Sequence, residues 1–248
     1  MTSGTPVARF EPILRRAEER KGGPRALRAL LPPVPSHASL AKRGDDRFLA
    51  MMCKVVNQAG FAWRVIERKW PQFEAAFLQF DPQRLARLPP EDWEAYLRDP
   101  RVVRHWQRIK ALRDNVDFVC AEADRHGSFG RFLASWPADD QVGLAAYLAR
   151  HGARLGGYSA HRFLRYAGWD AFILTGDVVN VLRNAGVEIN EQPGGKRELR
   201  RAQEAFNAWH IETGLPYCHL SRIAAFSTGD NVPYARLKAE RDQMTRSS

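Results

Sequence analysis

Cysteine and long apolar runs are both scarce in this sequence. Its 248 residues include only three cysteines, Cys53, Cys120 and Cys218, which lie far apart in the chain. This odd number argues against a disulfide framework, and an iron–sulfur cluster would need about four grouped thiolates. No window reaches the roughly 18 apolar residues that a membrane span needs, and no signal peptide opens the chain. We therefore expect a cytoplasmic protein that makes no membrane contact.

Lysine is scarce too, although the chain is basic. The 38 lysine and arginine residues outnumber the 28 aspartate and glutamate residues, which gives a formal net charge of +10, and only 7 of the 38 are lysine. Guanidinium groups bind phosphate oxygens in pairs and stack on flat rings, so an arginine-rich surface suits nucleic acid. High-GC codon usage also enriches arginine, and this second interpretation of the composition stays open.

Apolar residues recur at helical spacing along most of the chain, whereas no sustained period-two alternation bounded by hairpin turns occurs. The sequence therefore predicts an all-α fold. Proline and glycine mark the expected breaks, Pro71 among them. Helices are expected at residues 9–21, after Pro24, and at 45–59, 61–69, 72–79, 83–88, 91–98, 101–125, 139–150, 159–168, 177–185, 197–212 and 217–227.

A glycine pair separates two of the expected helices within residues 154–165. The turn reads Leu-Gly-Gly-Tyr-Ser, and a helix with several arginines follows it. Glycines accept positive φ and let another chain approach closely, while the helix start adds exposed N–H groups and a positive dipole end. The turn therefore suits a phosphate, although an ordinary helix corner with solvated arginines is the alternative. The candidate phosphate-binding residues are Gly156, Gly157, Ser159, Arg162 and Arg165.

Asp177 lies 20 residues after Gly157, within Thr-Gly-Asp-Val-Val at the start of another expected helix. Hairpin and aspartate together resemble the helix-hairpin-helix DNA glycosylase superfamily. The resemblance implies that the hairpin grips backbone phosphate and that Asp177 faces a nucleotide flipped out of the duplex. Asp177 also suits the N-cap of its helix, and the two roles are compatible.

A second stretch narrows the resemblance. Residues 52–66 read MCKVVNQAGFAWRVI, and FLQFDP follows at 77–82. These motifs, in this order, are similar to bacterial 3-methyladenine DNA glycosylase I, and the likeness extends over about residues 45–175. It implies a main domain of two helical lobes flanking a cleft at 41–230, preceded by a helical extension with a proline-rich linker at 1–40 and followed by a tail at 231–248.

The resemblance also assigns roles around the cleft. Base flipping needs a wedge in the duplex, flat walls for the base and negative charge beside the sugar. Asp177 would stabilise the sugar cation. Phe61 and Gly60 would form the wedge, and the stacking walls would be Trp63, Tyr158 and Trp169. A core position is the alternative for Phe61 and Trp63. Tyr158 and Trp169 are the weaker candidates, for which a structural role is favoured.

Two departures from the family pattern matter. Val55 stands where the family carries a pocket glutamate, which puts the usual alkylpurine contact in doubt. The paired cysteine and histidine ligands of the family's zinc site are missing, because Cys218 and His219 are adjacent and no cysteine or histidine precedes His37. We therefore expect no zinc. The hairpin carbonyls are left as a candidate site for a monovalent cation.

The superfamily's strand-nicking members use a lysine just after the hairpin, and here residues 111–195 contain none. We therefore predict a monofunctional glycosylase that hydrolyses the N-glycosidic bond of alkylated purines such as 3-methyladenine. Its expected partner is double-stranded DNA, which it would bind as a nucleoid-associated monomer. Two alternatives stay open: a non-catalytic DNA-binding protein, and a glycosylase for a different, bulkier lesion.

Overall fold

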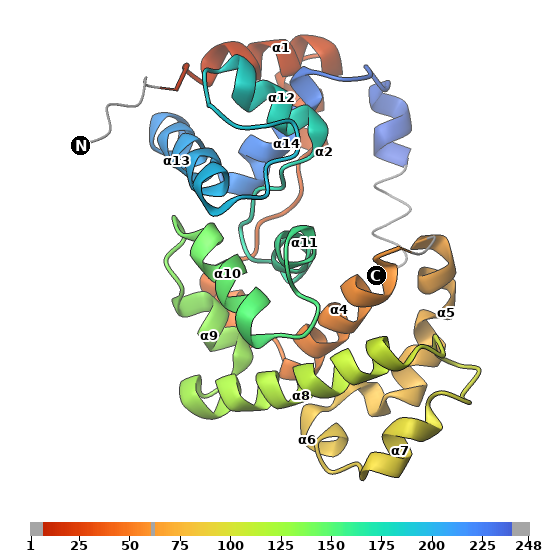
Figure 1. The fold of residues 1–248 in the computed structure, drawn as a ribbon. Coiled ribbons are helices and arrows are strands. Elements are labelled where there is room, and N and C mark those ends of the chain that lie inside the picture. The colour runs from red at the N-terminus through yellow and green to blue at the C-terminus, as the bar shows by residue number, and fades with distance from the viewer. Residues whose placement is uncertain (1–6, 61–62, 240–248) are drawn as a thin grey trace. The chain divides into compact units, whose positions relative to one another are not determined.

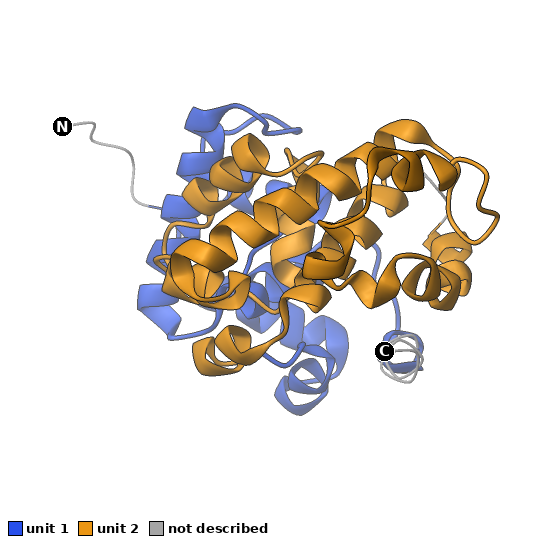
Figure 2. Ribbon diagram, turned by 90° about the horizontal axis from the view of Figure 1, so that it is seen from below, with its two compact units in different colours: residues 1–34, 170–248 blue, residues 35–169 orange. Residues whose placement is uncertain are grey.

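The computed structural model describes residues 7–60 and 63–239, and every regular element within these ranges is a helix (Figure 1). The all-α prediction is therefore confirmed. The chain forms two compact units, one made of Met1–Val34 with Asp170–Ser248 and the other of Pro35–Trp169 (Figure 2). We call them unit 1 and unit 2.

The unit boundaries differ from those predicted from the sequence. Residues 7–34 do not form a separate extension, because α1 (Glu11–Lys21) packs against α14 (Tyr217–Ser227) within unit 1. The start of the predicted tail is held as well. Buried Lys21 donates hydrogen bonds to Asn231 Oδ1 at 3.0 Å and to the carbonyl of Val232 at 2.9 Å.

Unit 1 packs an N-terminal segment and a C-terminal segment of the described chain around an aromatic core. Phe10 meets Trp209 with ring centroids 5.2 Å apart, and Phe172 stacks on Phe206 at 4.4 Å. Burying such rings removes a large apolar area from water and stabilises the unit. Besides α1 and α14, the unit contains α2 (Pro24–Leu30), α12 (Gly176–Asn184) and α13 (Lys196–Thr213).

Unit 2 is organised around its long helix α8 (Trp106–His126), which contacts α4, α6, α7 and α9 (Figure 1). Helix α11 packs against α4, and this contact brings the glycine turn near the end of α4. The remaining elements of the unit are α3 (His37–Lys42), α4 (Asp45–Gln58), α5 (Trp63–Ala76), η1 (Leu78–Phe80), α6 (Pro82–Leu85), α7 (Pro90–Ala95), α9 (Phe129–Ser135), α10 (Gln141–His151) and α11 (Tyr158–Tyr166).

The predicted break at Pro71 is wrong, because α5 continues through it. A proline inside a helix loses one hydrogen bond and costs roughly 3 kcal/mol, so other contacts must offset it. Trp70 provides them: its ring stacks on Phe73 at 5.5 Å and on Phe80 at 5.4 Å. Tertiary packing of these rings thus holds both sides of the proline in one helix.

Helices α3 and α9 were not expected from the sequence. Both are short, and both begin at a serine whose side chain accepts a backbone N–H of the first turn. Ser36 accepts from Ser39 at 3.1 Å, and Ser128 accepts from Arg131 at 3.0 Å. A serine before a short apolar stretch was therefore the sequence signal that could have predicted the start of each of these two helices.

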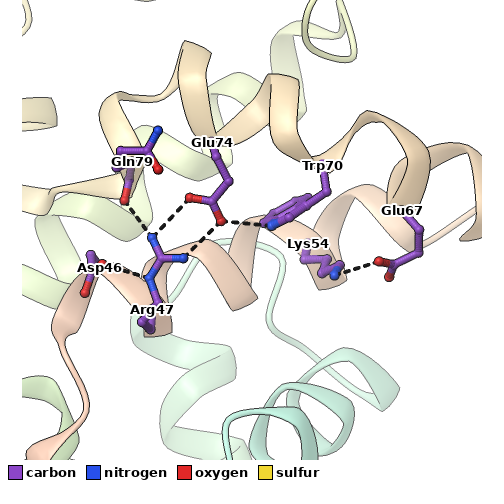
Figure 3. Close-up of polar contacts among 7 residues, drawn as sticks. All are labelled: Asp46, Arg47, Lys54, Glu67, Trp70, Glu74 and Gln79. Carbon is purple, nitrogen blue, oxygen red and sulfur yellow. Dashed lines mark hydrogen bonds and ion pairs between the residues drawn. The ribbon is translucent and has the colours of Figure 1, made fainter. Parts of the chain in front are cut away.

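Arg47 of α4 holds the end of α5 and the η1 turn in place (Figure 3). Its guanidinium donates to both carboxylate oxygens of Glu74, at 3.0 and 3.1 Å, and to the carbonyl of Gln79 at 2.9 Å. Gln79 needs such support, because it has φ +60° between two further residues with positive φ. Non-glycine residues adopt this region at a cost, so the arginine stabilises a strained turn.

We expect Arg47→Ala to lower the free energy of unfolding by about 1–2 kcal/mol, because the variant leaves the Gln79 carbonyl without the guanidinium donor and leaves Glu74 with only the indole N–H of Trp70. Denaturant unfolding followed by circular dichroism measures the change. Arg87→Ala, which removes an exposed arginine from the same unit, is the matched control. Equal stability of the two variants would show that Arg47 does not support the turn.

Candidate functional site

The C-terminal end of α4 is held by an arginine from α8. Arg108 donates to the carbonyl of Asn57 at 2.6 Å and to that of Ala59 at 2.8 Å, and so caps the C-terminal end of α4. Gly60 then turns the chain with φ +75°. Phe61, the second predicted wedge residue, lies outside the described residues. Helix α5 begins at Trp63, three residues after Gly60 in the sequence.

Trp63 belongs to a cluster of three aromatic rings around one cation. The guanidinium carbon of Arg162 lies 3.6 Å from the centroid of Trp63, 5.4 Å from that of Tyr166 and 5.8 Å from that of Tyr158. Trp63 remains 40% exposed and Tyr158 53% exposed. The structure therefore brings two predicted stacking residues together on the surface of unit 2, and adds Tyr166, which sequence reasoning missed.

Arg162 itself is not a surface cation. Only 8% of it is exposed, and its Nη2 donates to Gln58 Oε1 at 3.2 Å and to the Tyr166 hydroxyl at 3.4 Å. Its Nε is buried and has no hydrogen-bond partner. The prediction that Arg162 binds backbone phosphate is therefore wrong, because its head group is packed on Trp63 inside the aromatic cluster. We call Trp63, Tyr158, Tyr166 and Arg162 the Arg162 cluster.

A chain of polar contacts leads from the Arg162 cluster back to α4. Gln58 accepts from Arg162 and donates through Nε2 to Glu67 Oε1 at 2.9 Å. Glu67 is also paired with Lys54, at 2.8 Å (Figure 3). Val55, one helical turn before Ala59, is buried and apolar, and therefore contributes no carboxylate here. The carboxylate in this chain of contacts is that of Glu67 in α5, and Lys54 neutralises it.

Trp169 is a core residue and offers no surface for stacking. It is only 3% exposed, and its indole Nε1 donates to the carbonyl of Leu133 at 3.2 Å. The predicted stacking role of Trp169 is therefore wrong. The sequence around a tryptophan next to a glycine break does not indicate whether the ring is buried or exposed.

The predicted hairpin connects α10 to α11 and presents its glycines to solvent. Asn115 of α8 anchors the start of the hairpin through two hydrogen bonds to Ala153. Its side-chain oxygen accepts from the Ala153 N–H at 2.7 Å, and its side-chain N–H donates to the Ala153 carbonyl at 3.1 Å. Gly157 has φ +55° and ψ −131°, a conformation that glycine alone adopts without strain. Gly156 is exposed beside it, so an incoming anion would meet backbone without a side chain in the way.

The other predicted phosphate ligands occupy the first two turns of α11. Ser159 is half-buried, and its N–H donates to the Gly156 carbonyl at 3.3 Å. Arg165 is also half-buried. On the inner face of the helix, burial lowers the pKa of His161 to about 4, so this histidine is neutral near pH 7. Of the five predicted phosphate ligands, Gly156 and Gly157 are therefore the exposed ones.

Asp177 lies in the first turn of α12 in unit 1, and it is not the helix cap. Thr175 takes that role, because its hydroxyl accepts from the N–H of Val178 at 3.4 Å. The Asp177 carboxylate instead faces the backbone of Gly229. A Cβ on Gly229, which has φ +65°, would lie 2.4 Å from Asp177 Oδ1. The carboxylate thus packs against a turn that only glycine fits.

Arg20 of α1 holds the turn that touches Asp177. Its Nη2 donates to the carbonyls of Thr228 and Gly229, at 3.2 and 2.6 Å, and its Nε donates to that of Phe226 at 3.0 Å. These bonds satisfy carbonyls at the end of α14, where the helix leaves them unpaired. No local pattern predicts this contact, because the two segments lie more than 200 residues apart.

Cys218 and His219, the adjacent pair that lacks the spacing of the family's zinc ligands, make contacts within unit 1 to segments distant in the sequence. The N–H of Cys218 donates to Asp170 Oδ1 at 2.8 Å, and His219 Nε2 lies 2.8 Å from the carbonyl of Pro32. In the described ranges, no group of three or more histidine, cysteine or acidic residues is arranged to hold a metal ion. Nor is any described helix both long and apolar enough to cross a bilayer.

Comparison with known proteins finds matches in both sequence and fold. Residues 39–148 match the family model described as methyladenine glycosylase. The DNA-3-methyladenine glycosylase 1 of Escherichia coli is 33% identical over 72 residues, which are 29% of this chain and 38% of that protein. The DNA-3-methyladenine glycosylase of Haemophilus influenzae is 27% identical over 92 residues, 37% of this chain and 50% of that protein. The chain thus spans half or less of these curated relatives.

A solved structure covers more of the chain. The 8-oxoguanine glycosylase/lyase of Methanocaldococcus jannaschii, in complex with DNA, aligns with a TM-score of 0.50 over 89% of this chain and 99% of its own, at 15% identity. This likeness shows the fold, which is that of the helix-hairpin-helix DNA glycosylases, as the sequence predicted. The matches together show that the chain resembles 3-methyladenine DNA glycosylase I.

We expect Gly157→Ala to lower the free energy of unfolding by about 1–3 kcal/mol, because a Cβ strains a backbone with this φ and ψ. Gly156→Ala is the control, since Gly156 does not have positive φ and a Cβ there would only touch Ala149 at 4.0 Å. Thermal and denaturant unfolding of both variants give the measurement. Equal losses would mean that the hairpin does not require the Gly157 conformation.

Proposed function

We propose that this protein is a DNA N-glycosylase that flips alkylated purines, the class that includes 3-methyladenine, out of duplex DNA and hydrolyses their N-glycosidic bond. One observation carries the proposal. The region that matches the methyladenine glycosylase family contains the capped α4–α5 junction, and this junction presents Trp63 with an exposed face. The names of the curated relatives supply the substrate class.

The exposed rings suit a base that has left the stack. A flipped base loses its stacking partners in the duplex, and Trp63 and Tyr158 offer aromatic surface in exchange. Gly60 and Phe61 follow α4 at the position proposed to fill the gap left in the duplex. Arg108 supports this role, because its hydrogen bonds hold the carbonyls of Asn57 and Ala59, the residues that lead into Gly60.

The hairpin suits the phosphate backbone of the DNA. Gly156 and Gly157 are exposed and have no side chain to obstruct a phosphate, and the first N–H groups of α11 follow them. A helix N-terminus with free N–H groups favours an anion. Ser159 and Arg165 are the further phosphate ligands that we propose.

Asp177 would act on the sugar. As the base leaves with the bonding electrons, positive charge develops at C1′ and the ring oxygen, and a nearby carboxylate stabilises it and orients the attacking water. Water then adds to C1′ and loses its proton. Residues 111–195 contain no lysine that could form a Schiff base with the sugar, so we propose hydrolysis without strand cleavage.

A second candidate, a glycosylase for a different and bulkier lesion, is favoured by Val55. Its side chain is buried and apolar and cannot hydrogen-bond a base. In either case we propose a monomer associated with the nucleoid, with double-stranded DNA as its partner. We also propose activity without zinc or an iron–sulfur cluster, and the hairpin carbonyls as the place for a monovalent cation.

Asp177→Asn tests catalysis directly. We expect it to lower the rate of base release from alkylated duplex DNA about 100-fold or more, because the amide cannot neutralise the sugar cation. Mass spectrometry of the released bases gives the rate, and fluorescence anisotropy checks that DNA affinity is kept. Asp117→Asn, an exposed aspartate of α8, is the control. Tight DNA binding with no release by the unmodified protein would instead support a non-catalytic DNA-binding protein.

Gly229→Ala tests how the carboxylate is positioned. The new Cβ would collide with Asp177 Oδ1, so we expect kcat to fall about tenfold to 100-fold while the affinity for DNA stays unchanged. Gly194→Ala adds a Cβ in the same unit with no atom within 4 Å, and should keep full activity. If kcat is the same in both variants, the contact between Gly229 and Asp177 has no part in the reaction.

A further inference from the structure

Arg154 is an exposed arginine at the start of the hairpin, two residues before Gly156. Its backbone has φ +58°, in the left-handed region that residues other than glycine occupy at a cost. The chain is held on both sides of this residue, because Asn115 binds the backbone of Ala153 and the side chain of Leu155 is fully buried. The fold therefore fixes the backbone from which the Arg154 side chain projects.

The Arg154 side chain is directed towards the start of α8. Its Nη2 donates to Oε1 of Gln107, which is a neutral acceptor. Among the residues that the structure describes, no carboxylate forms an ion pair with Arg154. The guanidinium is thus oriented by a neutral amide and keeps its full positive charge at the surface.

A second guanidinium lies close enough to feel this charge. The pKa of Arg108 is lowered, mainly by burial and further by the positive charge of Arg154. Arg108 donates to the carbonyls of Asn57 and Ala59, and these are neutral acceptors too. Holding two like charges near each other costs free energy, and an anion that approaches both recovers that cost.

These two arginines connect the two parts of unit 2 that we assign to DNA. Arg108 holds the residues that lead into Gly60, the proposed wedge, and Arg154 leads into the exposed Gly156 and Gly157. A DNA strand that runs from the wedge to the hairpin therefore passes both guanidinium groups. The anion that such a strand brings is a phosphodiester, whose oxygens guanidinium groups bind in pairs.

We propose that Arg154 and Arg108 form a binding site for one phosphodiester of the damaged strand, close to the flipped nucleotide. Arg154 contacts the phosphate directly, and Arg108 contributes positive charge from the end of α4. Arg154 thus makes the contact that the buried Arg162 cannot make. Gln107 is a positioning residue, because it orients the guanidinium of Arg154 without touching the phosphate. The inference rests on the proposed function in one respect, since it takes duplex DNA as the partner.

Binding of a duplex that carries a stable abasic-site analogue tests the proposal without turnover. We expect Arg154→Gln to raise the Kd about fivefold to 20-fold and to lower the slope of log Kd against log salt concentration by about one, because one phosphate contact is lost. Fluorescence anisotropy gives both values. Arg87→Gln removes an exposed arginine from the same unit and should change neither. The same Kd and slope in Arg154→Gln as in the unmodified protein, or no DNA binding by the unmodified protein, would overturn the proposal.

Arg154→Gly separates the charge from the turn. Glycine adopts φ +58° without strain, so this variant keeps the backbone of the hairpin and removes only the guanidinium. It should raise the Kd by the same factor as Arg154→Gln. Unchanged DNA affinity in Arg154→Gly would show that the charge of Arg154 has no part in binding.

Gln107→Glu tests how Arg154 is positioned. The new carboxylate has the shape of the amide and neutralises Arg154, so we expect the Kd to rise at least about fivefold. Gln83→Glu adds the same negative charge at an exposed position of the same unit, and should raise the Kd by less than about twofold. Equal Kd values in these two variants would contradict the role of Gln107.

Neutral linkages in the DNA locate the phosphate. Single methylphosphonate linkages, which carry no charge, are placed within about three nucleotides on either side of the abasic-site analogue in the same strand. At one linkage the unmodified protein should lose affinity about fivefold or more, whereas Arg154→Gln should lose less than about twofold, because its contact is already absent. If every linkage weakens both proteins by the same factor, then Arg154 does not bind a phosphate of this strand.

Base release separates this inference from the proposed function. If the unmodified protein releases alkylated bases while Arg154→Gln binds DNA with an unchanged Kd, then the phosphate site is wrong and the glycosylase function stands. If no base is released while both variants of Arg154 weaken DNA binding as expected, then the catalytic function is wrong and the phosphate site stands.

Discussion

The stacking of Arg162 on Trp63 is the contact on which the candidate site of unit 2 depends. It joins α11, which follows the hairpin, to the start of α5, and through Gln58 it also reaches the end of α4. A guanidinium this deeply buried must be compensated, because desolvation of a charge is expensive. Three rings and two acceptors supply the compensation, and they thereby fix the relative positions of the two predicted motifs within one unit.

Several other arginines bind the protein's own carbonyl groups. Arg20 holds the end of α14, Arg108 holds the end of α4, and Arg43 donates to the carbonyl of Ala167 at 2.8 Å. The last carbonyls of a helix lack partners within it, and a planar guanidinium can reach two of them at once. The arginine excess is therefore only partly available to an anionic partner. The net charge therefore overestimates how many arginines are free to bind a partner, because it also counts those that bind the protein's own carbonyl groups.

The sequence predicted most helices and the two motifs, because periodicity and glycine breaks are local properties of the chain. The sequence-based prediction failed where side-chain packing determined the structure of a segment or the burial of a residue. Pro71 stays inside a helix because Phe80 and Phe73 pack on Trp70, and Trp169 is buried because the carbonyl of Leu133 lies beside its indole. Arg162 follows the hairpin at the spacing expected of a phosphate ligand. Its actual direction is set by Trp63, a residue 99 positions earlier.

The family match and the carboxylate that we propose to be catalytic lie in different parts of the chain. Residues 39–148 contain the α4–α5 junction, whereas Asp177 belongs to unit 1. There its carboxylate lies against Gly229, in a turn held by Arg20. The segments outside the matched region thus supply the second half of the proposed chemistry. Because Thr175 caps α12, the Asp177 side chain is not used as the helix cap, and its carboxylate can serve the reaction that we propose for it.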